Sequence, residues 1–507
     1  MSEAGFPYLS VLTVLPLVGA LVVALLPRSL PNLAKQLALA VSVLTLGLGV
    51  ATWLAFTPSG PRFQLRESYP WIPTWNVRFT FDVDGIALVM IALIVVLVPL
   101  VMLYSWHETR AETGEPAKRS THAYFALLLA LESTMIGVFA AADVFLFYVF
   151  FEVMLVPMYF LIGSFGGLRR QYAAVKFFLY SLVGGLFMLA SVIGLWVLGG
   201  HTFDWATLND ASFSTMAERW LFLGFFLAFA IKAPFFPFHT WLPDAGGAAP
   251  AGAAALLVGV LDKVGTFGIL RYCLPLFPNA SVYFAPWAIA LALVGIIYAA
   301  LIAVGQNDLK RLVSYTSIAH FGFIGIGIFA FTLQAGSGAV LYMLNHGLAT
   351  GLLFLVVGMF VYRRGSTLVT DFGGAGKLMP LLAGIFLFAG LASLALPGLA
   401  PFVSEFLVLI GVFQVNVTVA VIATVGIILA ACYVLWMVQR TTQGALNPAL
   451  SGVASMRRDL TAREMVVVAP LVALILALGF YPKPVLDVIN PAVERTLTHV
   501  TSVEAGK

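Results

Sequence analysis

Four charged side chains lie in stretches of sequence that are otherwise almost entirely apolar. Glu152 stands in AADVFLFYVFFEVMLVPMYFLIG, and Lys263 stands in GAAALLVGVLDKVGTFGILRYC. Lys232 follows WLFLGFFLAFAI, and Glu405 follows ASLALPGLAPFVS. A charged group inside a lipid bilayer is unfavourable unless it faces a partner or water, so each of the four is a candidate for ion transport. The alternatives are a glutamate that reaches the membrane surface and a structural ion pair for either lysine.

Two histidines and two further acidic residues occupy similar surroundings. His320 and His346 lie in VSYTSIAHFGFIGIGIFAF and AVLYMLNHGLATGLLFLVV. An imidazole titrates near neutral pH and is suited to proton relay, although each histidine could equally be a hydrogen-bonded core residue. Glu132 is a further candidate, with helix packing as the alternative. Asp262 is another because it precedes Lys263, but adjacent residues on a helix point about 100° apart and need not be partners.

Prolines stand beside Lys232 and Glu405. A proline inside a helix removes a backbone donor and clashes with the preceding turn, so we expect a helix to break at each place. The freed carbonyl groups next to a charged side chain would make a hydrated pocket. The predicted breaks are at Pro234, Pro237, Pro397 and Pro401.

The composition of the chain requires a membrane around these residues. Of its 507 residues, 61% are hydrophobic and only 10% are charged. A soluble core cannot hold that much apolar surface, whereas a helix of about 20 apolar residues spans a bilayer. We therefore predict an all-α polytopic membrane protein with about fourteen transmembrane helices, some of them broken, and with both termini on one side. The predicted spans cover residues 9–26, 36–56, 85–105, 122–141, 143–164, 172–199, 220–238, 248–276, 284–304, 309–332, 336–362, 378–410, 415–438 and 464–481.

The charged residues recur in two similar blocks. Each block contains five predicted helices, and the separation in sequence of Glu152 and Lys232 is close to that of His320 and Glu405. Interrupted helices at matching places in two halves are the best sequence indication of a transporter site. Because five is odd, the second block enters the membrane from the opposite side, so the repeats are inverted. The predicted domains are an N-terminal three-helix segment (1–121), a first repeat (122–276), a second, inverted repeat (284–438), and a region with a cytoplasmic loop, the last span and the C-terminal tail (439–507).

Basic residues in the loops predict the orientation. One set of alternate loops, which includes Arg110, Lys118 and Arg119, holds roughly twice as many lysines and arginines as the other, and such loops face the cytoplasm. The N- and C-termini are then expected outside the cytoplasm. The loop over 57–84 departs from this rule, because its arginines lie on the opposite side.

Several other kinds of site are not expected. Cys273 and Cys432 both lie in apolar surroundings, so the sequence predicts neither a disulfide framework nor a cysteine-held iron–sulfur cluster. The glycines of 325–330 lie inside an apolar span, and 373–377 lacks the other residues of a phosphate-binding loop. No spacing of histidines and carboxylates suggests a metal, and the scattered charges suggest no nucleic acid. We expect no redox centre and no cofactor in this chain.

Three stretches of sequence resemble one family of membrane proteins. They are FEVMLVPMY at 151–159, IKAP followed by PFHTWLPDA within 231–245, and NDLKRLVSYTS at 307–317. Together they resemble the antiporter-like, proton-translocating subunits of NADH-quinone oxidoreductase (respiratory complex I), and in particular the subunit M or chain 4 type. In that family a glutamate at the position of Glu405 is typical of subunit M, whereas subunits L and N usually carry lysine. One departure is Gly246, which stands where the family often has histidine.

The resemblance implies fourteen helices in two inverted repeats and a multi-pass protein of the bacterial plasma membrane. It implies a subunit of a proton-pumping enzyme in which flavin, iron–sulfur clusters and quinone are bound by partner subunits. The neighbouring membrane subunits would be of the L and N types. By motif, the proton-transfer residues are Glu152 and Lys232 as the essential carboxylate–lysine pair, Lys263 as the central lysine, His320 and His346 as the second-half relay, and Glu405 as the terminal acidic residue.

These residues suggest a mechanism. Glu152 would hold Lys232 protonated, a signal from the redox arm of the complex would separate the pair, and water would fill the gaps along the path. The proton would then pass by Lys263 and the two histidines to Glu405. A subunit of a multisubunit Na+/H+ antiporter or of a membrane-bound hydrogenase is the closest alternative, because it shares most of these motifs. A stand-alone solute transporter would need further polar groups for its substrate, and a structural scaffold would not explain matched charges in both halves.

Overall fold

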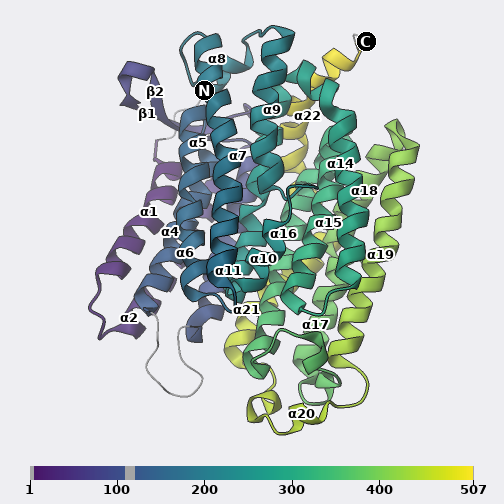
Figure 1. The fold of residues 1–507 in the computed structure, drawn as a ribbon. Helices are drawn as coiled ribbons and strands as arrows, with labels where there is room; N and C mark the ends of the chain where they lie inside the picture. The colour runs from purple at the N-terminus through teal and green to yellow at the C-terminus, as the bar shows by residue number, and fades with distance from the viewer. Residues whose placement is uncertain (1–4, 109–119, 506–507) are drawn as a thin grey trace.

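The helices of the chain form one tall bundle (Figure 1). The computed structural model describes residues 5–108 and 120–505. Apolar runs fold as helices because a bilayer offers no hydrogen bonds to the backbone, so each segment must satisfy its own groups. Within the described residues, twelve helices are long and apolar enough to span a membrane. They are α1 (Tyr8–Leu25), α2 (Pro31–Ala55), α3 (Gly85–Tyr104) with η2 (Ser105–His107), α4 (Thr121–Ala140), α5 (Val144–Val153) with α6 (Leu155–Phe165), α7 (Arg170–Leu198), the span from α11 (Ala251–Leu256) to α13 (Leu274–Leu276), α14 (Pro278–Val304), α15 (Leu309–Phe329), α16 (Leu333–Arg364), α19 (Val417–Thr442) and α21 (Ala462–Phe480).

Two further apolar runs form helices that are interrupted. α9 (Thr215–Lys232) is followed by α10 (Trp241–Ala248), and α17 (Pro380–Ser393) is followed by α18 (Ala400–Val415). With the twelve long helices, these pairs account for every apolar run of the sequence. The prediction of an all-helical membrane protein is confirmed.

The loop expected over 57–84 contains a β-hairpin. β1 (Gln64–Ile72) and β2 (Val77–Val83) pair antiparallel, and η1 (Pro73–Trp75) with a left-handed Asn76 makes the turn. The carboxylate of Glu67 in β1 accepts hydrogen bonds from two backbone N–H groups in the first turn of α1, at 2.8 and 3.0 Å. A carboxylate at a helix N-terminus satisfies donors that the helix cannot, so the hairpin fixes the start of the first span.

The C-terminal tail expected from the sequence is also a helix, α22 (Lys483–Ala505). Its apolar residues recur at helical spacing, and Ile489, Val493 and Val500 are buried. This face packs on α3, α13, α14 and α16, so α22 lies across spans from both ends of the sequence. The tail forms a packed helix because one of its faces is apolar. Its average composition is nevertheless polar, because the opposite face carries polar residues.

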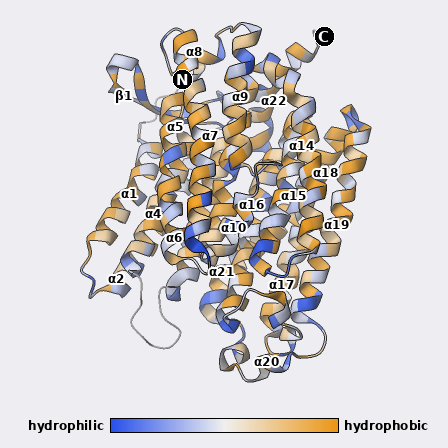
Figure 2. Ribbon diagram, viewed as in Figure 1, coloured by the Kyte–Doolittle hydropathy of each residue, from blue (hydrophilic) through white to orange (hydrophobic). Residues whose placement is uncertain are grey.

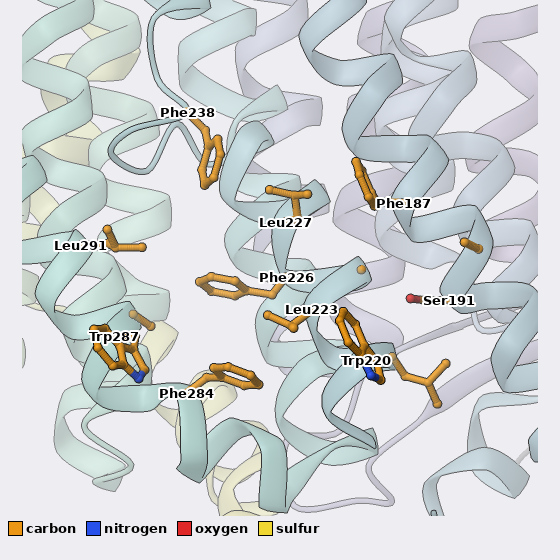
Figure 3. A pocket seen from close by; sticks show the side chains of 14 residues that line it. Phe187, Ser191, Trp220, Leu223, Phe226, Leu227, Phe238, Phe284, Trp287 and Leu291 are labelled. Atoms are coloured by element: carbon orange, nitrogen blue, oxygen red, sulfur yellow. The ribbon is translucent and has the colours of Figure 1, made fainter. Parts of the chain in front are cut away.

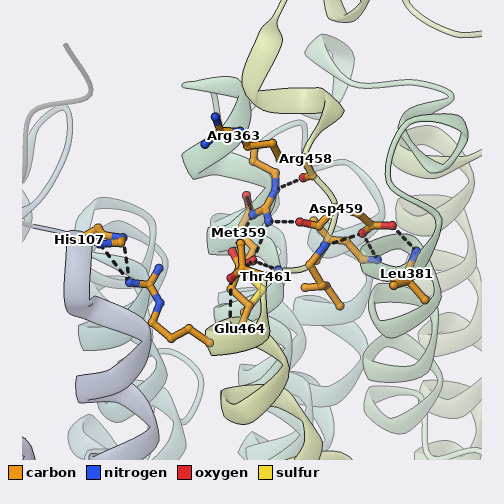
Figure 4. A network of polar contacts seen from close by, with 11 residues as sticks. His107, Met359, Arg363, Leu381, Arg458, Asp459, Thr461 and Glu464 are labelled. Carbon is orange, nitrogen blue, oxygen red and sulfur yellow. Dashed lines mark hydrogen bonds and ion pairs between the residues drawn. The ribbon is translucent and has the colours of Figure 1, made fainter. Parts of the chain in front are cut away.

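A polar network joins three helices at the end of the bundle opposite the termini (Figure 4). Arg363, near the end of α16, donates to both carboxylate oxygens of Glu464 in α21 at 2.8 Å. The same guanidinium donates to the carbonyl groups of Arg458 and Asp459 at 2.8 and 3.0 Å. The carboxylate of Asp459 in turn accepts from two backbone N–H groups at the start of α17, including that of Leu381. Each charge therefore has several partners, as a buried charge requires.

A second network lies at the end of the bundle that holds the termini. Arg271 is buried and donates to Asp82 at 2.8 Å and to Asp84 at 2.9 Å, which joins the α11–α13 span to β2 and the start of α3. Its guanidinium also lies 4.1 Å from the centre of the Phe63 ring, and Arg62 beside it donates to a threonine hydroxyl of α22 at 3.0 Å. Burial raises the pKa of Asp82, and Arg271 opposes this effect. We call this cluster and that around Arg363 the end networks.

The ribbon is mostly apolar over the height of the spans, and polar residues are more frequent toward its two ends (Figure 2). Both described ends of the chain lie on one side, as an even number of spans requires (Figure 1). Arg110, Lys118 and Arg119, used above for the orientation, lie outside the described residues. Short helices in the connections are α8 (Trp205–Asn209), η5 (Val369–Asp371), η6 (Ala375–Lys377), α20 (Pro448–Ser451) and η7 (Ala454–Arg457).

Candidate functional site

Glu152 lies at the end of α5, next to the irregular turn that separates α5 from α6. The residue is half-buried, and its Oε1 has no hydrogen-bond partner among the described residues. Gly185 of α7 faces it so closely that a Cβ at this position would overlap Oε1. A glycine is therefore needed for α7 to pass beside this carboxylate.

Lys232 is the last residue of α9 and is only 1% exposed. Its Nζ lies 4.8 Å from the centre of the Phe151 ring and 5.8 Å from that of Phe177. Glu152 and Asp262 are its acidic neighbours in electrostatic range, but Nζ has no hydrogen-bond partner among the described residues. The ammonium is thus held by aromatic faces, with its acidic partners at a longer distance.

The interruption after Lys232 contains both prolines that the sequence singled out. Pro234 and Pro237 lie between α9 and α10. The indole N–H of Trp241, the first residue of α10, donates to the carbonyl of Ile231 at 2.9 Å. This bond joins the two helix ends, and its acceptor is one of the carbonyl groups near the end of α9 that the break leaves without a helical donor.

Asp244 fixes the next helix in place. Its carboxylate binds Lys176 of α7 at 2.7 Å and Arg311 of α15 at 2.5 Å. One side chain of α10 therefore joins helices of both predicted repeats. The sequence motif that contains Asp244 contributed to the family resemblance, but the residue was not among the predicted site residues.

Lys263 follows a π-helical turn, η3 (Leu257–Leu261), and begins α12 (Lys263–Gly268), which η4 (Ile269–Cys273) continues. The side chain is fully buried, and its Nζ donates to the carbonyl of Val258. The same Nζ lies 2.6 Å from Nδ1 of His346. Wide turns of this kind release carbonyl groups inside a helix and are frequent at functional sites. Asp262, which lies between η3 and Lys263, is buried, and neither of its carboxylate oxygens has a partner among the described residues.

The two histidines lie together on α15 and α16. The rings of His346 and His320 are 5.1 Å apart at 85°, and the ring of Tyr342, one turn before His346, lies 5.8 Å from that of His320. The hydroxyl of Tyr342 donates to Oε2 of Glu405 at 2.8 Å. Contacts therefore run from Lys263 through both histidines and this tyrosine to Glu405.

The second interrupted span, α17 with α18, places Glu405 beside Tyr342, at the end of these contacts. Pro397 lies between α17 and α18, and Pro401 lies in the first turn of α18. Asn345, which neighbours His346 on α16, donates to the carbonyl of Ala400 at 2.7 Å. This bond binds a helix of the relay to the first turn of α18, and so fixes the position of Glu405 one turn later.

Glu132 lies apart from these residues. It is fully buried on α4, and its Oε1 accepts a hydrogen bond from Ser42 of α2 at 3.2 Å. Its Oε2 has no partner among the described residues. The contact supports helix packing in the N-terminal segment and does not connect Glu132 with the other charged residues. Glu152, Lys232, Lys263, His346, His320 and Glu405 are hereafter called the buried series.

Tyr342 and Asn345 are polar residues of the site that sequence reasoning missed. Tyr342 precedes His346 by one helical turn and therefore shares its face, which is the signal that could have found it. No group of three or more histidine, cysteine or acidic side chains that could hold a metal occurs within residues 5–108 and 120–505.

Comparison with known proteins identifies the family. A family model described as "NADH:quinone oxidoreductase/Mrp antiporter, TM" matches residues 141–430. The chain is 48% identical to NADH-quinone oxidoreductase subunit M of Mycobacterium tuberculosis, over 97% of this chain and 94% of that protein. It is similar to a chain of respiratory complex I from Thermus thermophilus with bound NADH, with a TM-score of 0.87, 30% identity, and coverage of 97% of this chain and 99% of that one.

A chain of the Mrp complex from Dietzia sp. has a TM-score of 0.84 at 21% identity, over 99% of both chains, and so shares the fold alone. The much higher identity to subunit M separates the chain from the antiporter alternative. The chain therefore belongs to the NADH-quinone oxidoreductase subunit M family, the proton-translocating, antiporter-like membrane subunits of respiratory complex I.

Proposed function

We propose that the buried series is the route by which this subunit moves protons, and that Tyr342 belongs to it. The observation that carries the proposal is the line of contacts between Lys263 and Glu405. Lys263 is hydrogen-bonded to Nδ1 of His346, the two imidazoles lie against each other, and Tyr342 donates to Glu405. Each of these side chains can give or take a proton.

Glu152 and Lys232 form the switch at the start of this route. Both carry an atom without a hydrogen-bond partner among the described residues, and the two groups lie within electrostatic range of each other. Breaking a buried ion pair costs about 3–5 kcal/mol. Moving one charge against the membrane potential costs about 2.3 kcal/mol per 100 mV. Because the two energies are similar, making and breaking this pair is strong enough to gate transport.

Asp262 connects the switch to the rest of the route. It interacts electrostatically with both Lys232 and Lys263, and it is buried without a hydrogen-bond partner among the described residues. In this scheme Asp262 attracts the proton that leaves Lys232, and water bridges the remaining gap to Lys263. His346 then accepts at Nδ1, and Glu405 is the last acceptor before release.

The other parts of the enzyme would supply the driving force. The flavin, iron–sulfur clusters and quinone belong to partner subunits, and subunits of the L and N types flank this one in the membrane arm. The chain lies in the bacterial plasma membrane with both termini outside the cytoplasm, and its two inverted repeats are 122–276 and 284–438.

The proposal is tested with Glu152→Gln and Lys232→Ala in the assembled enzyme. We expect NADH-driven proton uptake by vesicles that contain the purified complex to fall to the background, because either change removes one half of the switch. Glu494→Gln and Lys377→Ala remove the same charges from exposed positions and should leave uptake unchanged. Near-normal uptake with normal assembly in either buried variant would refute the assignment. Copurification of flavin and iron–sulfur subunits with the chain separates this enzyme from an antiporter complex.

A further inference from the structure

An apolar groove of about 760 Å³ runs along the outside of the bundle between α7, α9 and α14 (Figure 3). Phe238 lies at one end, and Trp220, Phe284 and Trp287 lie at the other. Ser191 of α7 contributes a polar side chain, and the other labelled residues are hydrocarbon or aromatic. A groove with this lining is suited to a hydrophobic ligand.

The groove opens away from the protein. Trp287 is 69% exposed, Trp220 is 67% exposed and Phe187 is 52% exposed, although all three lie on membrane spans or on α9. At this level of the bundle the surrounding medium is the bilayer. Tryptophan is enriched where a span meets the membrane surface, because its ring is apolar and its N–H is a donor. The Trp220 end of the groove is therefore the end near the lipid headgroups.

A positive charge stands beside this end. Arg219 precedes Trp220, and its guanidinium lies 3.6 Å from the centre of the Tyr283 ring, which precedes Phe284. The carboxylate of the neighbouring Glu218 is hydrogen-bonded elsewhere. It accepts from the side chain of Asn279 at 3.1 Å and from a backbone N–H of α14 at 3.0 Å. Among the described residues Arg219 has no ion-pair partner within 4.0 Å, so its charge is available to an anion at the groove mouth.

The groove fits within one leaflet. Its lining runs from Trp220 to Leu227 on α9 and from Phe284 to Leu291 on α14, a rise of about 10 Å on each helix, and Phe238 lies beyond these residues. Half of the hydrocarbon core measures about 15 Å. A transmembrane helix of a partner would extend through both leaflets. An acyl chain attached to a headgroup at Arg219 would instead end near Phe238, where the groove ends.

We propose that this groove binds one acyl chain of an anionic phospholipid whose phosphate pairs with Arg219. The lipid belongs to the leaflet on the side of the termini. The end of its chain covers the interruption between α9 and α10, because Phe238 lies in that interruption. The lipid thus lies against the segment that immediately follows Lys232, and it shields this segment from the mobile lipids of the bilayer. This site is independent of the roles proposed for the buried series.

The test uses the purified complex in phosphatidylcholine vesicles that contain a trace of phosphatidylglycerol with a diazirine near the end of one acyl chain. After photolysis, we expect mass spectrometry to find the label on this subunit, on peptides of α9, α14 and the segment 233–240. Arg219→Gln should lower this labelling at least fivefold, and Arg219→Lys should retain it. Arg78→Gln, which removes an exposed arginine of β2 on the same side, should have no effect.

A second variant removes the groove without changing the charge. Leu227→Trp places a large ring in the cavity and should lower labelling as strongly as Arg219→Gln, even if the latter assembles poorly. Equal labelling by a phosphatidylcholine probe, or unchanged labelling in both variants, would mean ordinary bilayer contact and would overturn the proposal. No labelling of these peptides in the unmodified complex would mean that a partner subunit covers the groove, and would overturn it as well.

Discussion

The end networks and the buried series are both made of charged side chains inside the bundle, but their partners differ. Arg363 and Arg271 each donate to carboxylates at 2.8 to 2.9 Å, and Arg363 has further bonds to backbone carbonyls. In the buried series, Lys232 has no hydrogen-bond partner among the described residues, and the carboxylate of Glu405 accepts a hydrogen bond from the hydroxyl of Tyr342. Charges that are paired with an opposite charge hold helices together, whereas charges without such a partner retain the freedom to exchange a proton.

The position of each cluster agrees with this difference. The end networks lie where helices start and stop, and they join segments such as α17, α21, β2 and the α11–α13 span. The buried series lies beside helix interruptions and a π-helical turn, where backbone groups are also less regularly bonded. Irregular backbone inside a membrane is tolerated where it is buried in protein or lines water, which is the environment that a proton route needs.

The largest effect should come from Lys263→Ala. This change removes the only lysine that contacts the histidine relay in the described chain, so we expect NADH-driven proton uptake per assembled complex to fall to the background. Lys35→Ala is the matched control, because Lys35 is also buried but donates to the carbonyl of Trp106, outside the series. If both variants lost uptake equally while assembling normally, burial alone would explain the effect and the comparison would fail.

Arg363→Ala should act on stability rather than on transport. Removing one partner of a buried, hydrogen-bonded pair costs about 3–5 kcal/mol, because Glu464 keeps a buried charge. We expect a lower midpoint of thermal dissociation and less assembled complex on native gels, with normal proton uptake per remaining complex. Arg364→Ala, at a partly exposed neighbouring position with one weaker backbone contact, should change neither quantity appreciably. Normal stability of Arg363→Ala would show that the end network does not hold the helices.

Tyr342→Phe should have a smaller effect on transport. The change keeps the ring beside His320 and deletes only the hydroxyl that donates to Glu405. The net free energy of such a bond is about 0.5–1.5 kcal/mol, which corresponds to roughly a two- to tenfold change in rate. Tyr433→Phe is a control, since the Tyr433 hydroxyl is buried near Glu405 without a hydrogen-bond partner among the described residues. Equal proton uptake in the two variants would remove Tyr342 from the route.

The spans and their interruptions could be predicted because both depend on local sequence. Apolar runs long enough to cross a bilayer predicted the helices. The prolines near Lys232 and Glu405 predicted the interruptions that follow α9 and α17. The hairpin and α22 were missed for different reasons. β1 and β2 lie in a stretch read as a charged loop, and α22 is too polar on average for a pattern search directed at spans.

The contacts within the site could not be predicted in the same way. The sequence indicates that Glu152 and Lys232 both lie in membrane-spanning segments, but the distance between their side chains depends on how α5, α7 and α9 pack. The close approach of Gly185 to Glu152 and the aromatic contacts of Lys232 are results of that packing. Tyr342 was missed because a buried tyrosine in a span is ordinary until its hydroxyl is found against a carboxylate.

The smallest effect should come from Glu132→Gln. Glutamine has the shape of glutamate and accepts the same hydrogen bond from Ser42, so packing of α2 on α4 should be retained. Because Glu132 contacts no member of the buried series, we expect less than about a twofold change in proton uptake, the limit set by a weak neutral hydrogen bond. Glu405→Gln, measured in parallel as the matched change within the series, should abolish most of the uptake. A loss of similar size in Glu132→Gln, with normal assembly, would mean that a buried carboxylate transfers protons even away from the interrupted helices, and that a position beside such a helix does not decide which buried charges take part.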